Sequence, residues 1–200
     1  MTKICISNFC LATDVMMDFL SCLHFAIGKS CYQSINLKPK QVQCLAMEAL
    51  YNDKDVFAVS PTGYGKFFIY HILPSLLARR NSVKQTLQNS RTTETTLDAV
   101  QAFPSPVVLV VSPLNSLMED QIRKINQGTD LRAGVFKVTL DENREEETSP
   151  SLRTADLDII FTHPESCLSS KEGLRLLQSD AYKKSVQTIV VDEAHCILEW

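Results

Sequence analysis

The sequence predicts a doubly wound α/β fold with a mostly parallel sheet, and its hydrophobic pattern carries the prediction. Short, nearly continuous apolar runs recur at 56–59, 107–111, 159–161 and 189–191, as in strands buried on both faces of a parallel sheet. Helical stretches lie between them, and such alternation is typical of α/β sheets. The 200 residues are 44% hydrophobic and 22% charged, which suits one globular domain with a sizeable core.

The chain is expected to begin with a helical lead-in over residues 1–35, followed by the α/β domain over residues 36–200. The lead-in contains six apolar residues at the spacing of one helical face. These residues are Val15, Met16, Phe19, Leu20, Leu23 and Ile27.

Two helices are predicted inside the α/β domain, over residues 66–77 and 114–125. The first is apolar almost all round, as in a helix packed under a sheet, and Pro74 is expected to bend it or to end its first part. The second is amphipathic and carries acid-before-base pairs at i,i+4 spacing. These pairs are Glu119 with Arg123 and Asp120 with Lys124.

Two stretches interrupt this pattern. Residues 79–102 are rich in Thr, Ser, Gln and Asn and have little periodicity, which predicts a long surface loop or polar insertion at about 79–105. Residues 141–147 are a run of charges, which is typical of a solvated surface. Neither stretch is expected to have a catalytic role.

Composition excludes some classes of protein. The net charge of −3 gives no electrostatic sign of a nucleic-acid binder, so that function has to be argued from local motifs. The seven cysteines contain no C-x-x-C pair, which favours reduced thiols in an intracellular protein over a zinc site. No membrane anchor or export signal is expected, because the apolar segment 16–27 is short and interrupted by Asp18 and His24.

Residues 55–66 have the strand, glycine-bearing loop and helix order of a phosphate-binding loop. Gly63 and Gly65 allow positive φ and close approach of the backbone to a phosphate, and Lys66 adds a charge for the β and γ phosphates. A plain glycine turn before a lysine is the structural alternative. Phosphate loops carry Ser or Thr after the lysine as a Mg²⁺ ligand, but this chain has Phe67. We therefore expect weak or absent ATP turnover.

Residues 188–195 are expected to form a strand that places two carboxylates at its C-terminal end. In a parallel sheet this is the edge that also carries the phosphate loop. Asp192 is expected to bind Mg²⁺, and Glu193 to orient and deprotonate the water that attacks the γ-phosphate. His195 is placed to relay the state of the nucleotide. A solvated strand end is the alternative for an isolated Asp-Glu pair, and the hypothesis requires that both carboxylates share one triphosphate pocket with the phosphate loop.

Asp192 to His195 spell the DEAH form of the helicase Walker B box, and about residues 35–200 resemble the RecQ family of DNA helicases. Five ordered motifs carry the resemblance: Leu37–Gln41, Ser60–Lys66, Val111–Gln121, Ile160–Glu165 and Asp192–Trp200. The resemblance implies an N-terminal RecA-like domain, incomplete at its C-terminus, of a 3′-to-5′ helicase that uses ATP and Mg²⁺. It further implies DNA as partner, both single strand and duplex junction, and a second RecA-like domain that is required for motor activity. Lys38 stands where an arginine is usual.

The resemblance also assigns roles to individual residues. Gln41 would read adenine, and the remaining nucleotide contacts would come from Pro61, Thr62, Gly63, Tyr64, Gly65, Lys66 and Phe67. Contacts to the DNA backbone would come from Ser112, Pro113, Asn115, Gln121, His163 and Pro164. Hydroxyls precede prolines at Ser112-Pro113 and Thr162-His163-Pro164, so simple helix capping is the alternative reading there. Trp200 and His195 would couple DNA binding to ATP hydrolysis.

Two other functions are considered. A catalytically impaired or truncated relative would act only as a nucleotide or nucleic-acid binding module, as Phe67 favours. A small-molecule kinase or other P-loop enzyme does not explain Gln41, the segment 112–121 or the DEAH box. The resemblance implies a nuclear protein, otherwise a cytoplasmic one, and not a secreted one.

Overall fold

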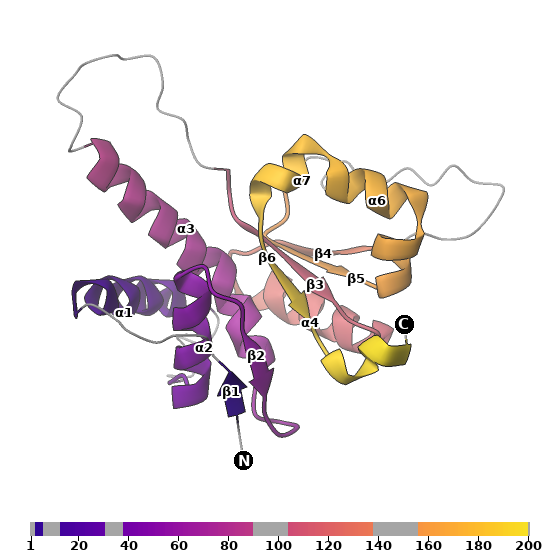
Figure 1. Ribbon diagram of the computed structural model, residues 1–200, viewed down its shortest axis with the longest axis horizontal. Coiled ribbons are helices and arrows are strands. Elements are labelled where there is room, and N and C mark those ends of the chain that lie inside the picture. Colours follow the sequence, from indigo (N-terminus) through magenta and orange to yellow (C-terminus); the bar gives the residue numbers. More distant parts are fainter. Residues whose placement is uncertain (1–2, 6–12, 31–37, 90–103, 138–155, 200) are drawn as a thin grey trace. The chain divides into compact units, whose positions relative to one another are not determined.

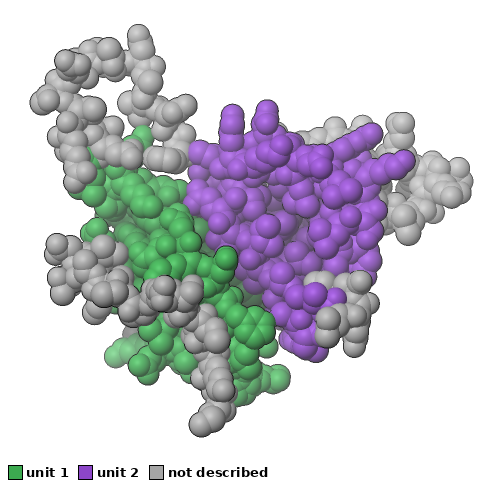
Figure 2. Space-filling model, in the orientation of Figure 1, with its two compact units in different colours: residues 1–103 green, residues 104–200 purple. Residues whose placement is uncertain are grey.

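The computed structural model describes residues 3–5, 13–30, 38–89, 104–137 and 156–199. They belong to two compact units, residues 1–103 and 104–200, which Figure 2 colours separately. Five sequence predictions lie wholly or partly outside the described residues: those on the lead-in 1–35, on Leu37, on residues 90–102, on the charge run 141–147 and on Trp200.

The second unit is built on a four-stranded parallel sheet with the strand order β4-β5-β3-β6 (Figure 1). The strands are β3 (Val107–Val111), β4 (Ala133–Phe136), β5 (Ile159–Thr162) and β6 (Val186–Val191). Every residue of β3 and β5 is buried, as predicted for strands covered on both faces. β6 is an edge strand instead, with Ile189 63% exposed, so the prediction of full burial is wrong there.

Helices cover both faces of this sheet. The helix α4 (Asn115–Gly128) connects β3 to β4, whereas η1 (Glu165–Ser169), α6 (Lys171–Gln178) and α7 (Asp180–Ser185) connect β5 to β6. The first connection runs toward the β4 edge and the second toward the β6 edge. Because parallel crossovers are right-handed, opposite directions put their helices on opposite faces. Figure 1 agrees, with α4 below the strands and α6 and α7 above them, and the doubly wound prediction is confirmed.

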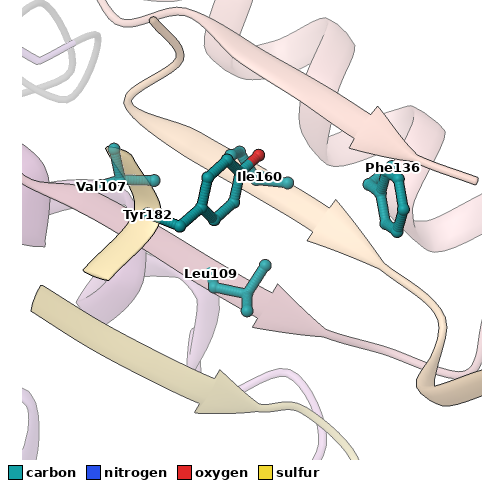
Figure 3. Close-up of a cluster of buried hydrophobic side chains, with 5 residues drawn as sticks. All are labelled: Val107, Leu109, Phe136, Ile160 and Tyr182. Carbon is teal, nitrogen blue, oxygen red and sulfur yellow. The ribbon is translucent and has the colours of Figure 1, made fainter. Parts of the chain in front are cut away.

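A compact apolar cluster lies on the face of the sheet that α6 and α7 cover (Figure 3). It consists of Val107, Leu109, Phe136, Ile160 and Tyr182. Because each strand contributes side chains at alternate positions, residues 107 and 109 of β3 lie on the same face of the sheet. The ring of Tyr182, from α7, packs on that face and is 1% exposed.

Helix α4 was predicted closely, and one of its two ion pairs was predicted correctly. Lys124 Nζ lies 2.6 Å from an Asp120 carboxylate oxygen, as expected at i,i+4 spacing. Arg123 lies 3.8 Å from Asp120 rather than beside Glu119. The Glu119 carboxylate is 3.4 Å from Lys137, which follows β4 and supplies a cation that the helical pattern does not show.

The described part of the first unit contains three helices and a two-stranded sheet. The helices are α1 (Thr13–Gly28), α2 (Gln41–Tyr51) and α3 (Phe67–Asn89). The strand β1 (Lys3–Cys5) pairs antiparallel with β2 (Phe57–Val59). Among the described residues, no helix is both long enough and apolar enough to cross a membrane.

Three predictions for this unit need correction. β2 was expected in the parallel sheet, but it pairs antiparallel with β1, and Phe57 is 63% exposed. Residues 79–89 were expected in a loop, but α3 continues to Asn89 and passes Pro74 without ending. The burial of Arg80 explains this extension, because its contacts hold a segment whose own pattern is not amphipathic. In α1, Leu20 is 45% exposed, and Cys22 and Ala26 join Phe19 and Leu23 on the buried face instead.

Candidate functional site

The loop between β2 and α3 has the backbone conformation that a phosphate-binding loop requires. Gly63 has φ +75° and Gly65 has φ +85°, so both glycines occupy the region that side chains disfavour. Tyr64 N donates to Pro61 O at 3.2 Å and closes a turn between them. The 23-residue helix α3 begins directly afterwards, which directs the positive end of its dipole at the loop.

The N-terminus of α2 binds this loop through two side chains that the sequence prediction missed. Gln43 Nε2 donates to Gly65 O at 2.9 Å and lies 3.4 Å from Tyr64 O, while Gln43 Oε1 accepts from Lys40 N at 2.7 Å. Lys40 Nζ donates to Tyr64 O at 3.0 Å and lies 4.0 Å from the centre of the Tyr64 ring. A glutamine three residues after the N-cap signals a capping box, but not a contact 22 residues away.

The other predicted nucleotide residues are placed around this loop in the first unit. Gln41 is the first residue of α2 and is exposed. Pro61 and Thr62 are exposed as well, and Lys66 is half-buried. Gln41 therefore lies two residues from the side chain that contacts the loop, and its predicted adenine contact stays a prediction.

Phe67 is the first residue of α3, at the position where a phosphate loop carries a hydroxyl. Its side chain is 36% exposed, and its ring centre lies 5.4 Å from that of His71, one helical turn later. A phenyl ring offers no oxygen to a cation. Hard cations such as Mg²⁺ take oxygen ligands, so this turn lacks one ligand of the usual set.

In the second unit, three predicted site residues follow neighbouring strands at one edge of the sheet. Val111 is in register with Thr162 of β5 and with Val191 of β6. Ser112, His163 and Asp192 come next, and the ladder continues through them, since Ser112 N donates to Thr162 O at 3.0 Å and Asp192 N donates to Val111 O at 2.9 Å. In open α/β sheets this carboxyl edge is where ligands bind.

The Asp-Glu pair after β6 has an unusual backbone. Glu193 has φ +51°, a left-handed conformation that is uncommon outside glycine. Its N–H is bonded to the Asp192 carboxylate at 3.0 Å, and its carboxylate lies 3.3 Å from His195 Nδ1. Strained residues of this kind concentrate at functional sites, where the surrounding structure holds them. The functional pair was predicted from the sequence, but the strained backbone of Glu193 was not.

The six predicted DNA-contacting residues differ in exposure. Asn115 is exposed and His163 half-buried, and His163 Nε2 is bonded to Asn115 Oδ1 at 2.6 Å. Ser112 and Gln121 are 1% and 4% exposed, and Pro164 is also buried, whereas Pro113 is half-buried. Buried side chains contribute to a surface only through the backbone they support.

The capping alternative for the two hydroxyls is not supported. The N-cap of α4 is Leu114, without a side-chain cap. Thr162 Oγ1 donates to the carbonyl of the next residue, His163, at 3.2 Å rather than accepting from a helix N–H. The Ser112 hydroxyl has no hydrogen-bond partner within the described part of the chain.

Comparison with known proteins identifies the lineage. The family model for DEAD/DEAH box helicases matches residues 40–200, which is most of the chain and includes the phosphate loop and the Asp-Glu pair. The chain belongs to the DEAD/DEAH box helicase family. As a family member it is an α/β domain of the RecA-like kind, and the resemblance to RecQ helicases is confirmed by its relatives.

Those relatives are similar at modest identity and much longer. The chain is 28% identical to the ATP-dependent helicase SGS1 of Saccharomyces cerevisiae over 163 residues, covering 82% of this chain and 10% of that protein. It is 30% identical to the ATP-dependent DNA helicase hus2/rqh1 of Schizosaccharomyces pombe over 161 residues, covering 79% and 10%. It is 26% identical to the ATP-dependent DNA helicase Q-like 4B of Arabidopsis thaliana over 175 residues, covering 86% and 13%. The chain thus spans between 10% and 13% of the length of these three relatives.

Proposed function

We propose that this chain is the first motor domain of a RecQ-type DNA helicase, which binds ATP with Mg²⁺ and contacts DNA. The observation that carries the proposal is the loop of Gly63 and Gly65, both at positive φ, immediately before Lys66 and a 23-residue helix. A triphosphate fits a loop of this kind because backbone N–H groups and the helix dipole attract its charge. The family's reaction, ATP hydrolysis coupled to 3′-to-5′ unwinding, is what this domain would drive together with a second RecA-like domain.

Each half of the site has a role in this proposal. Lys66 neutralises the β and γ phosphates and Gln41 reads adenine. Asp192 supplies carboxylate oxygens of the kind that Mg²⁺ prefers, and Glu193 accepts a proton from the attacking water. His195, beside Glu193, transmits the state of the nucleotide to the DNA side. The proposal requires that the phosphate loop and the two carboxylates meet at one nucleotide.

DNA is proposed to run along the carboxyl edge of the parallel sheet. Asn115 and His163 are the side chains that support this, because Asn115, at the start of α4, is exposed and bonded to the half-buried His163, which follows β5. Phosphate contacts fix the register of a strand without reading its sequence. The relatives named above are eukaryotic helicases, and two of them are named as DNA helicases, which makes the nucleus the proposed location.

ATP hydrolysis with and without single-stranded DNA tests the proposal. We expect the wild-type chain to bind ATP, and any turnover to rise with DNA and to fall about 100-fold or more in Glu193→Gln, as for loss of a general base. A chain that binds no nucleotide at millimolar concentration would contradict the proposal.

A second candidate is a binding module without catalysis, and Phe67 favours it. Loss of a metal-site partner costs about 10- to 100-fold in metal affinity or activity. The chain would then still bind nucleotide but hydrolyse it slowly or not at all. Turnover by wild type and Phe67→Ser decides between the two. A gain of about 10-fold or more in Phe67→Ser supports the impaired reading, whereas equal and brisk rates reject it.

A further inference from the structure

Gln43 lies between the start of α2 and the phosphate loop, and the oxygen and nitrogen of its side-chain amide make different contacts. The amide oxygen accepts from Lys40 N at 2.7 Å, which closes the first turn of α2. The amide nitrogen donates to Gly65 O at 2.9 Å, and this carbonyl also accepts from Phe68 N at 3.1 Å. One side chain therefore joins a helix cap to the residue at which the loop turns into α3.

This contact is buried and specific to an amide. Gln43 is 3% exposed, so water does not replace the bond when it is lost. A carboxylate of the same size would still accept from Lys40 N but would place negative charge against the Gly65 carbonyl. A Cβ at Gly65 would lie 3.1 Å from Gln43 Nε2, which shows how closely the side chain approaches the loop backbone.

We propose that Gln43 is a positioning residue of the phosphate loop: by fixing the Gly65 carbonyl, it turns the N–H groups at the start of α3 toward the phosphate before nucleotide arrives. Gly65 is held at φ +85°, a conformation that the loop alone would not keep in a single state. A loop ordered in advance loses less entropy when it binds its ligand. The inference rests on the proposed nucleotide-binding function of this loop.

Gln43→Glu tests the role, because it keeps the acceptor for Lys40 N and removes the donor toward Gly65. The probe is Mg-ADP, titrated calorimetrically into the full chain, with the ³¹P chemical shift of the bound β-phosphate as a second readout. We expect Gln43→Glu to weaken ADP binding about 5- to 20-fold, as for a lost buried hydrogen bond with an opposing charge, and to shift the β-phosphate signal. Gln127→Glu makes the same chemical change at an exposed position of α4, and we expect ADP affinity within about 2-fold of wild type.

The outcomes separate the possible failures. The positioning role is overturned if Gln43→Glu binds ADP with wild-type affinity and leaves the β-phosphate signal unchanged. It is also overturned if the loss of ADP binding is no larger than the unfolded fraction of the variant seen by circular dichroism. If Gln43→Glu does not fold, Gln43→Asn replaces it, because its amide falls one methylene short of Gly65 O and the same loss is expected. Wild type that binds no ADP overturns the nucleotide function itself, and the role of Gln43 with it.

Discussion

His163 Nε2 donates a 2.6 Å hydrogen bond to the side-chain oxygen of Asn115, a residue 48 positions earlier, and so links the residue after β5 to the first residue of α4. These strands are adjacent and in register up to Thr162 and Val111. The bond thus fixes the distance between the end of β5 and the start of α4, both of which lie at the proposed DNA edge. A site that follows a phosphate backbone depends on such spacing, since successive phosphates must meet successive donors.

The first prediction concerns this pair. Asn115→Ala and His163→Ala should each weaken binding of single-stranded DNA, and the double variant should lose less than the sum, with a coupling of about 0.5 to 1.5 kcal/mol. Fluorescence anisotropy with a labelled oligonucleotide at fixed salt measures this. The control is Gln127→Ala, because Gln127 is an exposed residue of α4, the helix that begins at Asn115. Additive losses would show that the bond does not organise the DNA site.

The second prediction separates backbone strain from side-chain contact in the phosphate loop. Gly63→Ala should lower the free energy of unfolding by about 1 to 2 kcal/mol, because its φ of +75° is strained for alanine and a Cβ would meet no atom within 4 Å. Gly65→Ala should cost more, because its Cβ would also press on Gln43. Urea unfolding compares the two variants, and an equal or smaller cost for Gly65→Ala would contradict the tight approach of Gln43.

The third prediction tests what holds the second half of α3. Arg80 is 6% exposed, and its Nη1 donates to Tyr51 O at 2.6 Å and to Asp53 Oδ1 at 2.7 Å. Arg80→Ala should cost about 2 to 3 kcal/mol, mainly through the buried bond from a charged donor to the Tyr51 carbonyl. Its neighbour Arg79 is exposed and lies over the ring of Phe25, 4.9 Å from its centre, so Arg79→Ala should lower the free energy of unfolding by only about 0.5 to 1 kcal/mol. If both variants lowered the free energy of unfolding by a similar amount, Arg80 would not be the residue that holds the second half of α3.

The fourth prediction concerns Tyr182 in the core of the second unit. Its hydroxyl is buried and has no hydrogen-bond partner among the described residues, and burial raises its pKa. Tyr182→Phe keeps the ring and removes the unsatisfied group, so the free energy of unfolding should stay level or rise by about 1 kcal/mol. Tyr51→Phe should instead lose stability, because the Tyr51 hydroxyl lies 3.7 Å from Cys22 Sγ. Thermal unfolding measures both, and a clear loss in Tyr182→Phe would reveal a partner for its hydroxyl.

Features set by local sequence were predictable in this protein. The unbroken apolar runs of β3 and β5 correspond to strands buried on both faces, and the alternation with helices gave the doubly wound sheet. Gly63 and Gly65 were assigned positive φ because the chemistry of a phosphate loop needs it, and both have it. Each of these features depends on residues that are close together in the chain.

Features set by distant contacts were not predictable. The contact of Gln43 with Gly65 and that of Arg80 with Tyr51 join positions 22 and 29 residues apart, where no periodic pattern signals them. The pairing of β2 with β1 was not predicted for the same reason, because an apolar run indicates a strand but not which strand lies beside it. The strain at Glu193 is likewise imposed by the structure around it, since the sequence offers no glycine there.

The last prediction is a pH dependence that originates at Glu48. This side chain is 8% exposed within α2, and desolvation raises its pKa, an effect that the charge of Lys54 partly offsets. A carboxyl whose pKa is higher in the folded state binds its proton more tightly there, so its favourable contribution is complete below the unfolded pKa and is lost as pH rises through the folded pKa. At pH 7, well above the ordinary value of 4.5 for this group, the raised pKa of Glu48 therefore costs stability. Glu48→Gln should raise Tm at pH 7, and its advantage should shrink as pH falls toward 4.5, the ordinary value for the group.

The matched control for this prediction is Asp55→Asn, which neutralises an exposed carboxylate in the same unit. Scanning calorimetry at several pH values gives Tm for all three proteins. An advantage of Glu48→Gln that stays constant with pH would mean that the gain comes from packing or helix propensity, because only a titrating group contributes a slope. A lower Tm in Glu48→Gln at pH 7 would mean that the ionised carboxylate is stabilised by a favourable contact, most directly with Lys54, that outweighs its desolvation.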